Sequence, residues 1–119
     1  MKDERVRGFR VALQNLIESL QATVRVSRWT ESESIPAPLQ ESASQLVARL
    51  GAADRLVSKP FTGSPPDVAR VTVMCTSMRR LDAAYVTYRQ RIERAPSERD
   101  AAAMSLEAEI DDVKAEAGW

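Results

Sequence analysis

The chain has 119 residues, which is enough for one domain with its own core, and its 44% hydrophobic and 29% charged residues exclude a disordered polypeptide. Its 17 basic and 17 acidic residues balance, so net charge does not direct the chain to nucleic acid or to an anionic membrane. Aromatic residues and glycines are few, which favours helices over a sandwich or a barrel.

The first two predicted helices are identified by apolar residues that recur every three or four positions. The first such stripe comprises Val6, Phe9, Leu13, Leu16, Leu20 and Thr23, with Ile17 and Val24 beside it. This spacing predicts a helix over residues 3–27 with Asp3 as its N-cap. The second helix is predicted over residues 36–58, because Pro36 suits a first helical turn and Pro60 disfavours continuation. Its stripe comprises Leu39, Ala43, Leu46, Leu50, Ala53 and Val57, with Val47 and Leu56 beside it.

The third and fourth helices have the clearest starting signals. Ser64 can cap a helix whose first turn is preset by two prolines, so the third helix is predicted over residues 65–94. Its stripe comprises Val71, Met74, Met78, Leu81, Tyr85, Tyr88 and Ile92. Ser97 is the expected cap of a fourth helix over residues 98–117, which Gly118 terminates. Its stripe comprises Ala103, Leu106, Ile110, Val113 and Ala117.

These four helices predict a single all-α domain over residues 1–119. Because the connections are short, consecutive helices should lie side by side and antiparallel, and the expected fold is an up-down-up-down four-helix bundle. The alternative is a pair of helical hairpins that swaps or dimerises into a larger bundle. No strand alternation occurs in the sequence, and we expect more than about 70% helix.

Cysteine content and hydropathy indicate where the chain resides. Cys75 is the single cysteine, which excludes an internal disulfide and is typical of a reducing compartment. The sequence opens with charged residues, and no apolar run approaches the roughly 20 residues that a membrane span needs. We therefore expect a soluble cytoplasmic protein with no membrane partner.

The residue types that most often carry catalysis are missing. Histidine is absent, which argues against catalytic triads and against di-iron helical bundles, and no glycine-rich phosphate loop occurs. Glu109 and Asp112 share one helical face, a spacing that all-helical nucleotide pyrophosphohydrolases use for magnesium. The acidic residues available for the required second pair lie in a loop or at a helix start. We therefore expect a solvated acidic face, no enzymatic activity, no metal and no cofactor.

Arginines of the third predicted helix form a candidate anion-binding set: Arg79, Arg80, Arg89 and Arg91. The alternative function is accordingly a regulator that binds a small anionic ligand or nucleic acid through these side chains. We favour pairing with the acidic fourth helix or plain solvation, because an antiparallel arrangement places Arg79 and Arg80 level with residues 111–112. Nucleic-acid binding is not expected, since no lysine-rich tract or base-stacking aromatic stripe accompanies them.

Two features of the third helix leave alternatives open. Tyr85 and Tyr88, together with Met74 and Met78, either line a ligand pocket or only fill the core. Core packing is favoured, because methionine stripes usually fill gaps. Cys75 is expected to be a buried, inert thiol, because no histidine is present to activate it.

Apolar residues outside the predicted stripes indicate self-association. Val11 on the first helix, and Val73 and Val86 on the third, lie off the predicted core faces. Trp119 follows the fourth helix and either packs back or anchors an interface. Two-fold dimers are the commonest homo-oligomers, so a homodimer is the expected state. The leading hypothesis is a non-enzymatic protein-interaction or scaffolding bundle that self-associates.

Overall fold

The computed structural model describes residues 4–29 and 35–119. Helices make up 86% of it and the described residues contain no strand, which confirms the all-α class. The helices are α1 (Glu4–Ser27), α2 (Ala37–Ser44), α3 (Leu46–Val57), α4 (Pro65–Arg94) and α5 (Arg99–Glu116), with a 3-10 turn, η1 (Pro96–Glu98), before α5. Asp3, the predicted N-cap, lies outside the described residues. Over the described ranges, every helix is too short or too polar to cross a membrane.

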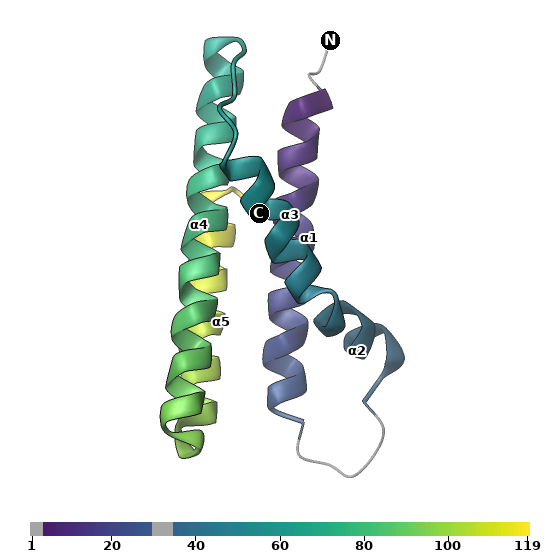
Figure 1. Ribbon diagram of the computed structural model, residues 1–119, viewed down its shortest axis with the longest axis vertical. Helices are drawn as coiled ribbons and strands as arrows, with labels where there is room; N and C mark the ends of the chain where they lie inside the picture. The colour runs from purple at the N-terminus through teal and green to yellow at the C-terminus, as the bar shows by residue number, and fades with distance from the viewer. Residues whose placement is uncertain (1–3, 30–34) are drawn as a thin grey trace.

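The two longest helices, α1 and α4, lie side by side at the centre of the fold (Figure 1). Helix α3 packs on this pair from one side and α5 from the other, and α3 and α5 have no contact with each other in the described part of the chain. Helices α1 and α4 begin at the same end of the molecule, and α5 returns alongside α4 in the opposite direction. Helix α5 is therefore an edge helix with one uncovered face.

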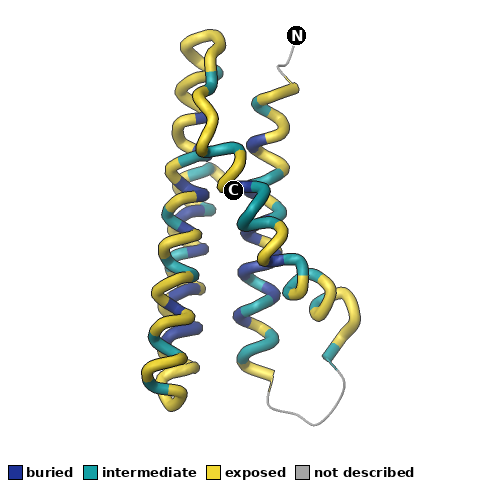
Figure 2. Tube along the Cα trace, viewed as in Figure 1, coloured by how far each residue is buried: buried dark blue, intermediate teal, exposed yellow. Residues whose placement is uncertain are grey.

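The core is built from the stripes that the sequence predicts. Leu13, Leu16 and Leu20 of α1 are fully buried, and they meet Leu81 of α4 and Ile110 of α5 in one apolar cluster. Buried positions recur along α1, α4 and α5, as the dark blue segments of Figure 2 show. Full burial of a leucine stabilises the folded state by about 1.5–3 kcal/mol relative to exposure. These residues therefore fix the relative positions of α1, α4 and α5.

The prediction of one continuous helix over residues 36–58 is wrong, because a turn at Gln45 divides it into α2 and α3. The cause is a tertiary contact with α1. The wholly buried Ser19 donates its hydroxyl to the carbonyl of Ser42 at 2.8 Å, near the end of α2. Arg49 of α3 in turn donates Nη1 to the Ser19 hydroxyl at 2.8 Å. This polar bridge satisfies groups at the break, and α2 leans away from α4 (Figure 1).

The break also affects which side chains of α3 are covered. Leu46 is buried as predicted, whereas Val47, expected beside the core stripe, is 76% exposed. Val47 lies about 100° further around the helix than Leu46 and borders an open depression beside α4. Because α2 leans outward, no helix covers this flank of α3.

The helix ends differ from prediction in their capping groups. Helix α4 begins at Pro65 with Ser64 at the N-cap position, but the Ser64 side chain makes no capping hydrogen bond. Ser97 lies within η1, so α5 begins at Arg99 after Glu98 rather than being capped by Ser97. The helix predicted over residues 98–117 therefore begins one residue later, because the tight turn after α4 is a 3-10 turn, and it ends one residue earlier, at Glu116 with Ala117 as the C-cap.

Candidate interaction groove

An open groove lies where α5 stops short of the ends of α1 and α4. Helix α5 ends in a Schellman motif, in which the Trp119 N–H donates to the Lys114 carbonyl at 2.8 Å and the Gly118 N–H donates to Ala115 at 3.1 Å. Gly118 adopts a φ of 76°, as the predicted terminator should. Beyond this point α1 and α4 continue without α5 between them. We call the resulting depression of about 780 Å³ the end groove.

The floor of the end groove is apolar. It is formed by Val6 and Val11 from α1, Val73 and Met74 from α4, and Trp119 beyond α5. Val11 and Val73 are 43% and 47% exposed, so this floor is open to solvent. Three of the four residues that the sequence analysis assigned to an interface, Val11, Val73 and Trp119, therefore lie together in one groove.

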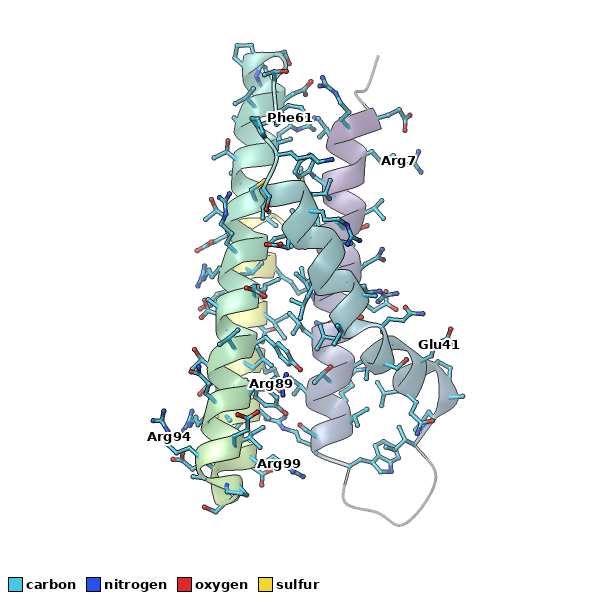
Figure 3. The ribbon with its side chains drawn as sticks, in the orientation of Figure 1. Arg7, Glu41, Phe61, Arg89, Arg94 and Arg99 are labelled. Carbon is cyan, nitrogen blue, oxygen red and sulfur yellow. The ribbon has the colours of Figure 1, made fainter. Side chains whose placement is uncertain are left out.

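The opposite side of α1 and α4 is closed at this end of the molecule. Phe61, in the segment between α3 and α4, packs edge-on against Phe9 with ring centroids 5.8 Å apart (Figure 3). The Arg5 guanidinium covers the Phe61 ring at 4.9 Å. Loop residues thus cover this end of the molecule on the α3 side, whereas the α5 side is hollow.

Three arginines, Arg7, Arg10 and Arg70, stand at the rim of the end groove, and we call them the rim arginines. The acidic groups at the rim are Glu4, Asp67 and Glu116. Glu116 forms an ion pair with Arg80 at 2.8 Å, and Asp67 lies 4.0 Å from the Arg70 guanidinium.

Arg10 lies over the Trp119 ring, 5.8 Å from its centroid. Within the described residues no carboxylate pairs with Arg7, which projects from α1 away from α4 (Figure 3).

Val86, the fourth predicted interface residue, lies on a different face of α4. Val86 is 45% exposed, much as Val73 is, but a separation of 13 positions corresponds to about 220° around an α-helix. Val73 borders the end groove, whereas Val86 does not line it. The four predicted interface residues therefore do not form one continuous surface.

Arg80, one of the four candidate anion-binding residues, is held by acidic side chains of α5. Its guanidinium pairs with Glu109, with Asp112 at 3.7 Å and with Glu116 at 2.8 Å. Hydrogen bonds that Arg80 donates to Glu109 and to Glu116 raise the pKa of Arg80 above its ordinary value. The predicted pairing of this arginine with the acidic helix is confirmed. Glu109 and Asp112, the two carboxylates considered above as magnesium ligands, both pair with the Arg80 guanidinium.

The remaining arginines of the set are also engaged within the chain. Arg79 donates to the Val57 carbonyl at 3.0 Å, Arg89 pairs with Glu93 at 3.3 Å, and Arg91 pairs with Glu98 at 3.5 Å. Arg79 therefore turns towards α3 rather than towards residues 111–112. The four side chains point to separate partners and do not converge on one anion-sized site.

The tyrosine and methionine set divides between the core and two surface depressions. Met78 and Tyr88 are buried in the core, and Met74 is buried beneath the end groove. Tyr85 is half-buried, stacks on Tyr88 at a centroid distance of 6.1 Å and borders the depression beside Val47. The structure thus offers no enclosed pocket common to these four residues.

The structure also defines the chemistry that the described residues can support. No group of three or more metal-ligating side chains occurs in the ranges that the structure describes. Cys75 is half-buried, and desolvation raises the pKa of its thiol while nearby Arg79 opposes the change. A raised pKa keeps the thiol protonated and weakly nucleophilic near neutral pH.

Comparison of the chain with known protein families, with curated proteins and with solved structures finds no match. The end groove is therefore the feature from which a function can be inferred. Its rim arginines were not among the residues predicted from the sequence. Arg7, Arg10 and Gln14 recur at helical spacing on either side of Val11. A single valine among polar residues of one helix face is the pattern that could have identified these arginines.

Proposed function

We propose that this chain is a non-enzymatic protein-interaction bundle that self-associates as a homodimer through the end groove. Its working unit is an antiparallel four-helix bundle in which α2 and α3 together take the place of the second helix. The direct contacts of α1 with every other helix and the return of α5 along α4 support this organisation. Engagement of Arg79, Arg80, Arg89 and Arg91 within the chain gives anion binding less support.

One observation carries the proposal: α5 stops short of one end of α1 and α4. Residues within 4–14 of α1 and 67–74 of α4 line the groove, which extends for about 12–16 Å along these helices from the C-terminal end of α5. Val11 and Val73 present apolar surface there at 43% and 47% exposure. Covering each of them with another apolar surface contributes about 1 kcal/mol, so a helix-sized occupant is energetically favoured.

The first test is the mass of the purified chain in solution over a dilution series, measured by light scattering. At micromolar concentration and above, we expect about twice the chain mass of 13.2 kDa, with dissociation on dilution. Val11→Glu places a charge on the groove floor and should shift the mass towards 13.2 kDa with unchanged helix content. A wild-type mass of 13.2 kDa at all concentrations would contradict self-association.

A further inference from the structure

The end groove has a complementary surface on the same chain, on the uncovered outer face of α5. This face consists of Ala101, Met104, Ala108, Asp111 and Ala115, all exposed and spaced alternately by three and four residues. Met104 is 63% exposed, although it is one of the larger apolar side chains of the chain. Spacing of this kind places the five residues along one line of an α-helix, as in a coiled coil.

Charge makes this face complementary to the end groove. Residues 100–119 carry six acidic residues and one basic residue, but Glu107, Glu109, Asp112 and Glu116 pair with arginines of the same chain. Asp111 lies within the outer face and forms no hydrogen bond or ion pair in the described residues. At the groove rim, Asp67 and Glu116 are directed to Arg70 and Arg80, and Arg7 pairs with no carboxylate of the described residues. Asp111 beside exposed alanines therefore matches Arg7 beside an apolar floor.

A chain cannot fill its own end groove, because the groove begins where its own α5 ends. We propose that the occupant is the C-terminal half of α5 from a second copy, which enters through its outer face. This inference rests on the proposed self-association and assigns the partner surface. Because α5 still packs on its own α1 and α4 through its inner face, one α5 is held between two chains.

The arrangement closes with two-fold symmetry. When the two α5 ends approach each other near Trp119, the free ends of α1 and α4 in each copy overlap the α5 of the other. Each copy then gives one groove and the C-terminal half of one outer face, which carries Ala108, Asp111 and Ala115. The competing arrangement, outer face against outer face, would bring the Asp111 carboxylates of two acidic helices together and is disfavoured by repulsion.

The test is a charge exchange between two exposed residues. Arg7→Glu changes the rim and Asp111→Arg changes the outer face, and neither residue has an ion pair with the described part of the chain. Because a two-fold dimer contains each contact twice, either variant alone should have a dissociation constant about tenfold higher than the wild type. The mixture should regain near wild-type affinity, since one groove then pairs Glu with Arg and the other is unchanged. Sedimentation equilibrium measures affinity, and native mass spectrometry identifies the heterodimer.

Controls separate the local effect from a change of net charge. The control variants are Arg94→Glu, at the end of α4 far from the groove, and Asp54→Arg, on α3. Both should leave the dissociation constant within about twofold of the wild type. A wild-type dimer that is insensitive to Arg7→Glu and Asp111→Arg, or a mixture that is not restored, would overturn this inference but leave self-association intact. A monomeric wild type would overturn the proposed function.

Discussion

Substitution of Ser19 by alanine tests the polar bridge that divides α2 from α3. The Ser19 hydroxyl is fully buried, donates to the Ser42 carbonyl at 2.8 Å and accepts from Arg49 at 2.8 Å. A neutral hydrogen bond contributes about 1 kcal/mol, and one from a charged donor about 1.5–3 kcal/mol. Alanine favours a helix by about 0.5 kcal/mol relative to serine, which offsets part of this loss. Water can also reach the half-buried Arg49, which offsets part of the loss of its hydrogen bond. We therefore expect a net loss of about 2 kcal/mol in the free energy of unfolding.

The assay is urea denaturation followed by far-ultraviolet circular dichroism, at one fixed low protein concentration because association stabilises the folded state. Ser27→Ala is the matched control, since the Ser27 hydroxyl only donates to the Val24 carbonyl within α1. It should change the free energy of unfolding by less than about 0.5 kcal/mol. Equal effects of Ser19→Ala and Ser27→Ala would refute the bridge as the cause of the break.

Three further predictions concern α4 and α5. Gly118→Ala should cost about 1 kcal/mol and increase water exposure of Trp119, detected by a red shift of tryptophan fluorescence, because alanine is strained at a φ of 76°. Cys75 should react more slowly with an aromatic disulfide reagent at pH 8 than the urea-unfolded chain does. Since burial raises the pKa of this thiol, the stability that it contributes should be lost as pH rises above the ordinary value of 9.0. Arg80→Met should lower the melting temperature, by a margin that shrinks as salt rises from about 0.05 to about 0.5 M.

Local signals in the sequence account for most of the helices. Two consecutive prolines after Ser64 give the start of α4, and Gly118 gives the end of α5. The break at Gln45 has no comparable signal, because it depends on Ser19 and Arg49, which are 30 residues apart in sequence. A contact between distant segments cannot be read from helical spacing.

The end groove was predictable only in part, for a related reason. Spacing identifies Val11 and Val73 as residues outside the core, but their proximity depends on how α1 and α4 are aligned. Val86 gives the same signal in sequence as Val73 and yet lies on another face of α4. The outer face of α5 was not predicted from the sequence, because three of its five residues are alanines and one is an aspartate, and these give only a weak apolar pattern.

The most direct test of the end groove compares Val73→Glu with Val86→Glu. Both valines are on α4, and they are exposed to nearly the same extent, at 47% and 45%. The two variants therefore match in helix, residue type and added charge, and differ in the face of α4 that they alter. Sedimentation equilibrium should give a dissociation constant at least about tenfold above wild type for Val73→Glu and one within about twofold for Val86→Glu. Equal effects, or weakening by Val86→Glu alone, would contradict self-association through the end groove.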